Sequence, residues 1–164
     1  MRRVELLLAE CYANACAAGE IARGLGVGAR IRHDAKMGRD KVLKKIESLR
    51  ERLSEGSSIV AVIDYEEGSM REFVARNFEF KEVLFDGAVH VGVYKRDGRV
   101  LAVVFDPHIE GFLCRTTGRF CGEGERRTIK RGGMVRVCEE ISPTCVDILR
   151  QISRAIGNLL GSST

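Results

Sequence analysis

The chain has no tryptophan, only two prolines among its 164 residues, and no apolar run longer than a β-strand. A membrane-spanning helix needs about 20 consecutive apolar residues, so none is expected here. Hydrophobic residues make up 45% and charged residues 30% of the chain, without a low-complexity tract, which is typical of soluble globular proteins. We therefore expect one domain spanning residues 1–164 and no membrane partner.

The sequence also lacks a convincing export signal. Residues 1–18 superficially imitate a signal peptide, but Glu5 and Glu10 interrupt the apolar segment, which predicts a first strand and a cytoplasmic protein instead. None of the six cysteines has the two-residue gap typical of structural zinc, so free thiols, one or two disulfides, and zinc remain alternatives. Cys11 is expected to be structural, because a carboxylate neighbour such as Glu10 raises the pKa of a thiol.

Apolar runs and helical periods alternate along the first half of the chain. Strands are predicted at residues 4–9, 29–33 and 59–63, and helices at 11–23, 41–53 and 70–78, the last with Ser69 as its N-cap. Three such units imply a Rossmann-like, largely parallel α/β sheet with helices on both faces. Residues 88–94 and 99–105 flank a turn containing Asp97-Gly98 and predict an antiparallel hairpin. A helix is predicted at 145–160.

Acidic residues follow three of the predicted strands. Glu10 follows the first strand, Asp64 and Glu66 follow the third, and Glu110 comes shortly after the second strand of the hairpin. In an open α/β sheet, ligands bind beyond the carboxyl ends of the strands. Asp64 and Glu66 should point to the same side, because side chains alternate along a strand. Carboxylates gathered there suit Mg²⁺, or Mn²⁺, together with the phosphates of a substrate.

These carboxylates resemble the signature of the Toprim domain, in which a Glu follows the first strand and an Asp-x-Asp follows a later one. The resemblance covers about residues 4–113, with Glu10, Asp64 and Glu66 at the matching positions. Residues 114–164 lie outside it and are expected to form a basic loop and a C-terminal helix. It implies magnesium-dependent phosphodiester chemistry, with these three residues catalytic and, with Glu110, metal-binding. The chain departs from the pattern at Cys11, where Gly is frequent, and at Glu66, where Asp is usual.

Basic residues gather in two segments that suit a nucleic-acid backbone. The chain carries a net charge of +4, which permits such a partner without requiring it. One segment lies before a predicted helix and the other in a glycine-rich loop predicted at residues 115–133. The predicted substrate-binding residues are Lys36, Arg39, Lys41, Arg115, Arg126 and Arg127.

Three functions follow as hypotheses. The first is a magnesium-dependent nuclease or other nucleic-acid-processing enzyme, in which His108 is a candidate general acid or base. The second is a non-catalytic nucleic-acid-binding or assembly module on the same scaffold. The third is a small homodimer with the helix at residues 146–160 in its interface and with carboxylates that merely end strands.

Overall fold

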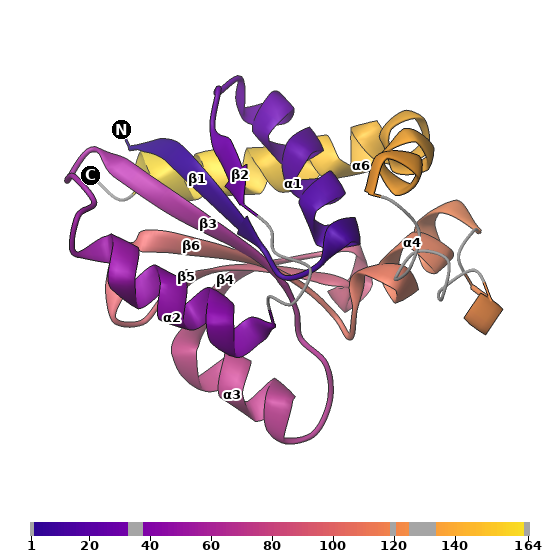
Figure 1. Cartoon of the computed structure of the whole chain (residues 1–164), viewed down its shortest axis with the longest axis horizontal. Coiled ribbons are helices and arrows are strands. Elements are labelled where there is room, and N and C mark those ends of the chain that lie inside the picture. The colour runs from indigo at the N-terminus through magenta and orange to yellow at the C-terminus, as the bar shows by residue number, and fades with distance from the viewer. Residues whose placement is uncertain (1, 33–37, 119–120, 125–133, 163–164) are drawn as a thin grey trace.

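A six-stranded mixed sheet with helices on both faces forms the molecule (Figure 1). The computed structural model describes residues 2–32, 38–118, 121–124 and 134–162. The strands are β1 (Arg3–Ala9), β2 (Arg30–Arg32), β3 (Ser57–Asp64), β4 (Phe78–Leu84), β5 (Val89–Tyr94) and β6 (Asp97–Phe105). The helices are α1 (Tyr12–Leu25), α2 (Arg39–Arg50), α3 (Ser69–Asn77), α4 (Ile109–Thr117) and α6 (Met134–Ser162), with a 3₁₀ turn, η1, at Phe85–Gly87.

The strands are arranged in the order β2-β1-β3-β6-β5-β4. Strands β2, β1, β3 and β6 are mutually parallel, whereas β5 pairs antiparallel with both β6 and β4. The predicted α/β class and the antiparallel addition to a parallel sheet are confirmed. The hairpin turn differs from the prediction, since it is formed by Lys95 and Arg96, and Asp97-Gly98 begins β6.

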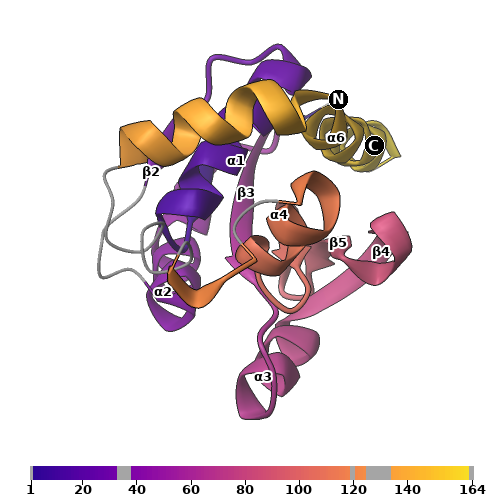
Figure 2. The same ribbon diagram turned by 90° about the vertical axis from the view of Figure 1, so that its right-hand side faces the viewer.

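Two hydrophobic layers hold the helices against the sheet. One packs α1, α4 and α6 on one face, with Ile21, Phe112 and Ile152 among its buried residues. The other packs α2 and α3 on the opposite face around Ile46 and Val74. Viewed along the sheet, α1 and α6 lie on one side and α2 and α3 on the other (Figure 2). Every residue of β3 is buried, because both of its faces are covered by helices.

The last helix packs on the first. Ser153 Oγ donates a hydrogen bond to the Ile21 carbonyl oxygen at 2.9 Å, and a Cβ added at Gly24 would lie 2.4 Å from that hydroxyl. Glycine at residue 24 therefore permits the close approach of α1 and α6. Leu149, Ile156 and Leu160 are buried within the chain, so the apolar side of α6 covers α1 rather than a partner. The apolar side chains of this helix are therefore already covered within the chain, and the homodimer stays a hypothesis.

Several predicted boundaries were also wrong. Gly68, not Ser69, is the N-cap of α3, and Phe78 begins β4, which the sequence analysis missed. The predicted loop at 115–133 begins inside α4, an unpredicted helix that continues to Thr117. The final helix starts at Met134 rather than at residue 145. Among the described residues, no helix is sufficiently long and apolar to span a membrane.

Candidate functional site at the carboxyl ends of β1 and β3

The chain reverses its direction of travel across the sheet between β1 and β3. From β1 it crosses to β2 on one side, and from β2 it returns past β1 to β3 on the other. Both strands are parallel, so their carboxyl ends meet at one edge. The two connections diverge at this switch point, which is the usual ligand position in open α/β sheets.

Glu10 and Asp64 meet at this switch point. Glu10 directly follows β1, and Asp64 is the last residue of β3. The Asp64 backbone N–H donates to Glu10 Oε2 at 2.8 Å, while the Glu10 backbone N–H donates to the Val62 carbonyl oxygen at 3.1 Å. The register of the two strands thus brings together two carboxylates 54 positions apart in the sequence.

Asp64 lies on the face covered by α1 and α4. Its neighbours in β3 alternate, with Val62 in the α1 layer and Ile63 in the α2 layer, which directs Asp64 toward α4. There Asp64 Oδ1 accepts a 3.0 Å hydrogen bond from the backbone N–H of Ile109, the first residue of α4. The positive end of a helix dipole therefore faces this carboxyl.

Burial and like charge act together on Asp64. Only 6% of the residue is exposed, and burial raises its pKa well above the usual carboxyl value. The nearby carboxylates of Glu10 and Glu110 raise the pKa further, whereas the hydrogen bond from Ile109 opposes them. A negative charge on Asp64 is thus unfavourable in the protein alone, and a bound cation would relieve this cost.

Glu110 reaches the cluster from the first turn of α4. It is 5% exposed, and its Oε2 lies 3.4 Å from His108 Nδ1. His108 is the N-cap of α4, with Nδ1 accepting the Gly111 backbone N–H at 2.9 Å. Because that lone pair is occupied, we assign the ring proton to Nε2 and treat the contact with Glu110 as close packing. His108 thus has a capping role, and its predicted acid-base role remains a hypothesis.

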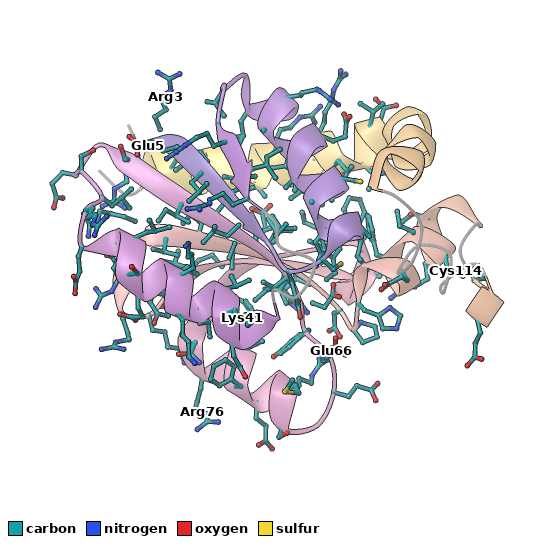
Figure 3. The ribbon with its side chains drawn as sticks, in the orientation of Figure 1. Arg3, Glu5, Lys41, Glu66, Arg76 and Cys114 are labelled. Carbon is teal, nitrogen blue, oxygen red and sulfur yellow. A yellow bond between two sulfur atoms is a disulfide. The ribbon has the colours of Figure 1, made fainter. Side chains whose placement is uncertain are left out.

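Glu66 is less closely joined to the cluster. Its φ of 65° lies in the left-handed region, so the strand alternation used to orient it ends before this residue. The Glu66 backbone N–H donates to the Pro107 carbonyl oxygen at 2.7 Å, and its side chain is half-buried. Its charge acts on Asp64 more weakly than those of Glu10 and Glu110. Figure 3 shows Glu66 and Lys41 in the lower middle of the molecule, away from Arg3 and Glu5 at its upper left.

A second polar cluster adjoins this edge and was not predicted. Arg71 of α3 donates to both carboxylate oxygens of Asp106, at 2.6 and 2.9 Å, and His90 Nε2 lies 3.0 Å from Asp106 Oδ2. The Arg71 guanidinium also lies 3.9 Å from the ring centroid of Tyr65. Burial alone would raise the pKa of Asp106, but hydrogen bonds from Arg71 and His90 hold it below its usual value. This cluster fixes α3 against the ends of β5 and β6.

The predicted basic residues are only partly described. Lys41 is exposed in the first turn of α2, and Arg115 is exposed in the last turn of α4. Arg39 begins α2, so it is helical rather than in the preceding loop. Lys36, Arg126 and Arg127 lie outside the described residues, as does the side chain of Arg39.

The cysteines whose side chains the structure describes adopt two states. Cys114 and Cys121 form a disulfide that joins α4 to the segment after it, while Cys11 is a free thiol. Burial raises the pKa of Cys11 to about 12, with the Asp64 carboxylate as the next contribution. Carboxylates therefore raise the pKa of this thiol, as expected, but burial is the larger cause and Asp64 contributes more than the predicted Glu10.

The carboxylate oxygens at this edge suit a hard cation, although they are few. Among the described residues, no three His, Cys, Asp or Glu side chains are arranged to hold one metal ion. Magnesium usually keeps several waters and needs only one or two protein carboxylates, which Glu10 and Asp64 supply in chemical type. A magnesium ion at these two residues would therefore take most of its ligands from water and substrate oxygens.

The fold and this edge define a class rather than a family. The chain is a mixed α/β protein of Rossmann-like connectivity, with buried carboxylates at its switch point. Comparison with protein-family models, curated proteins and solved structures finds no match.

Proposed function

We propose that this protein carries out magnesium-dependent phosphodiester chemistry on nucleic acid, as a nuclease or other nucleic-acid-processing enzyme with a Toprim-like core. The observation that carries the proposal is the meeting of Glu10 and Asp64 at the switch point, with Asp64 Oδ1 bound to the start of α4. Glu10 and Asp64 would hold the ion, with Glu66 and Glu110 as supporting carboxylates. Mn²⁺ would be accepted by the same oxygen donors.

The division of charge at this edge supports a phosphate substrate. When bound, a magnesium ion stabilises the charge that develops on phosphoryl oxygens. The exposed cations Lys41 and Arg115 would contact neighbouring phosphates, together with the predicted Lys36, Arg39, Arg126 and Arg127. The carboxylates would thus act at the scissile phosphate while the basic residues position the strand.

The test is calorimetric titration with MgCl₂ and MnCl₂, followed by assays on labelled DNA and RNA with magnesium or EDTA. Wild type is compared with the double variant Asp64→Asn and Glu66→Gln, and with a control that removes the same charge from exposed positions, Glu51→Gln and Glu55→Gln. We expect sub-millimolar binding and strand cleavage that only the first double variant loses. Absent binding, or equal binding by all three proteins, would contradict the proposal.

A cytoplasmic location belongs to the same proposal, because nucleic acid is met there. The Cys114–Cys121 disulfide weighs against it, since cytosolic disulfides are rare outside hyperthermophiles.

The alternative is a nucleic-acid-binding or assembly module without catalysis. It is favoured by the absence of a three-ligand group among the described residues. The two functions differ in one measurement: binding that falls steeply with salt but is unchanged by EDTA, without any cleavage, supports the module.

A further inference from the structure

A cleft of about 640 Å³ opens at the end of the molecule opposite the carboxylates. It lies beside the first residues of β1, between the end of α1 and the last turns of α6. The cleft forms because α6 continues beyond Leu25, where α1 ends and Gly26 caps it. Pockets of 300–1,000 Å³ are the usual size for specific ligands.

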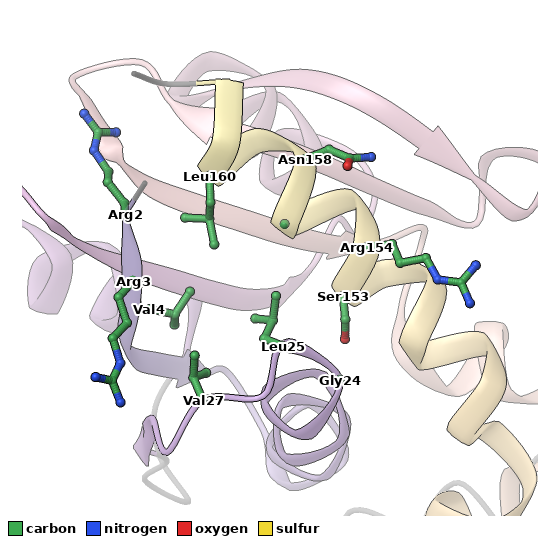
Figure 4. A pocket seen from close by; sticks show the side chains of 11 residues that line it. Arg2, Arg3, Val4, Gly24, Leu25, Val27, Ser153, Arg154, Asn158 and Leu160 are labelled. Atoms are coloured by element: carbon green, nitrogen blue, oxygen red, sulfur yellow. The ribbon is translucent and has the colours of Figure 1, made fainter.

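The inside of the cleft is apolar. Val4, Leu25, Val27 and Leu160 point toward one another across it (Figure 4). Val4 and Leu160 are buried, whereas Leu25 and Val27 are half-buried and remain available for contact. Glycines at positions 24 and 157 contribute no side chains to the walls. An apolar group entering here would lose contact with water on several sides.

The rim is cationic on both sides. Arg2 and Arg3 border the cleft from β1 and the residue before it, and Arg154 borders it from α6, with all three side chains directed outward (Figure 4). None of the described residues that line the cleft is acidic. Arg2 Nη1 donates to the Gly98 carbonyl oxygen at 2.8 Å, which holds this side chain near the rim. Guanidinium groups bind carboxylates through paired hydrogen bonds.

We propose that this cleft is a docking site for a short peptide segment of a partner protein, with one or two apolar side chains flanked by acidic residues on both sides. The apolar side chains would fill the cleft, and the acids would meet Arg2 and Arg3 at one side and Arg154 at the other. A single-headed amphiphile would meet the cations of only one side. The exposed Asn158 amide adds a donor and an acceptor that match a peptide group.

The site is independent of the proposed phosphodiester chemistry. It lies at the amino end of β1, whereas Glu10 follows the carboxyl end of that strand. The variant Asp64→Asn should therefore bind the peptide as wild type does, whichever function the carboxylates have.

The probe is a panel of fluorescein-labelled hexapeptides, each with a central pair of leucines, isoleucines or phenylalanines and two aspartates on either side. Matched peptides replace the apolar pair with serines or the aspartates with asparagines. Binding is measured by fluorescence anisotropy at low and high salt. We expect at least one apolar acidic peptide to bind, with affinity that falls as salt rises, and both matched peptides to bind more weakly.

Gly157→Leu is the decisive variant. An added Cβ at Gly157 would have no neighbour within 4 Å, so the wall of the cleft has room for a side chain to start there, and leucine favours a helix. The control is Gly161→Leu, also in α6 and equally open, but not part of the lining. Gly157→Leu should weaken binding at least tenfold, and Gly161→Leu should leave it unchanged.

Arg154→Ala should weaken binding about two- to fivefold, which is the effect of losing one exposed ion pair. The control is Arg150→Ala, because Arg150 is also exposed but does not line the cleft. The proposal is overturned if no peptide of the panel binds below about 1 mM. Binding that survives Gly157→Leu would overturn it too. Dodecanoate, a single-headed amphiphile, is tested beside the peptides. If dodecanoate binds while no peptide does, and Gly157→Leu abolishes dodecanoate binding, the cleft takes a small amphiphile and the peptide assignment is wrong.

Discussion

Glu10 accepts a hydrogen bond from the backbone N–H of Asp64, and this contact joins the carboxyl ends of β1 and β3. Burial raises the pKa of the Asp64 carboxyl, and the nearby negative charge of Glu10 raises it further. One contact therefore both aligns two strands and places like charges side by side. Such an arrangement costs stability in the protein alone and is expected where a cation binds.

Asp64→Asn should stabilise the metal-free protein at neutral pH, because the variant removes a buried carboxyl whose pKa is raised by burial and by the charge of Glu10. The folded protein holds the Asp64 proton more tightly than the unfolded chain, so wild-type stability falls as pH rises from the usual carboxyl pKa to the raised one. Asparagine does not titrate and can still accept the Ile109 N–H. In urea unfolding between pH 4 and 8, the free energy of unfolding of Asp64→Asn should exceed that of wild type by an amount that grows with pH. A constant or reversed difference between the two proteins would refute this.

Asp97→Asn should act with the opposite sign. Hydrogen bonds from Arg99 lower the pKa of Asp97, with contacts of 3.0 Å to Nε and 2.7 Å to Nη2. The carboxylate therefore adds stability above its usual pKa, and this is lost as pH falls through the lowered value. We expect a loss of about 1 kcal/mol at pH 7, because solvent near the surface screens the pair. Urea midpoints that coincide with wild type at pH 7 would count against this role.

Gly92→Ala should destabilise the antiparallel edge. A Cβ at residue 92 of β5 would lie 2.4 Å from the Glu79 carbonyl oxygen of β4, which is backbone and cannot swing aside. We expect a cost of about 1–3 kcal/mol, as for other overpacked positions. Gly28→Ala is the control, since a Cβ there meets nothing within 4 Å, and it should stay within about 0.5 kcal/mol of wild type. Equal unfolding midpoints for both variants would contradict the predicted clash between β5 and β4 at residue 92.

Cys11 should react slowly with iodoacetamide in the folded protein. With a pKa of about 12, roughly one thiol in 10⁴ is ionised at pH 8. The alkylation rate should rise about tenfold per pH unit up to pH 10 without a plateau, measured by peptide mass spectrometry. In non-reducing denaturant the same thiol should react faster and level off near its ordinary pKa. A plateau near pH 9 in the folded protein would contradict the assigned burial and charge.

Strand composition carried most of the fold prediction. The apolar runs of β1 and β3 are explicit in the sequence, and a residue that follows such a run must lie at the sheet edge, which is how Glu10 and Asp64 were found. Strand β4 was missed because its alternation of Phe78 and Phe80 with charged residues begins directly after Asn77, without a loop. The orientation of Glu66 was predicted from the alternation of side chains along a strand. This alternation ends before Glu66, because its backbone is in the left-handed region.

The cluster around Asp106 could not be predicted from one sequence. Arg71 belongs to α3 and His90 to β5, and their meeting depends on β5 lying beside β6 and on where α3 packs. Local patterns do not encode strand order, which is set by packing over the whole sheet. The disulfide between Cys114 and Cys121 was likewise one of several open alternatives, because pairing depends on where α4 ends.

The packing of α6 on α1 has a consequence for how the protein is made. Ile21 and its neighbours in α1 leave the ribosome early, whereas Ile152 and Ile156, which cover them, are synthesised more than a hundred residues later. During that interval one face of the nascent sheet carries a helix whose outer side is uncovered and apolar. This layer of the fold is therefore expected to be completed only once α6 has been synthesised, with a transient need for protection from aggregation before then.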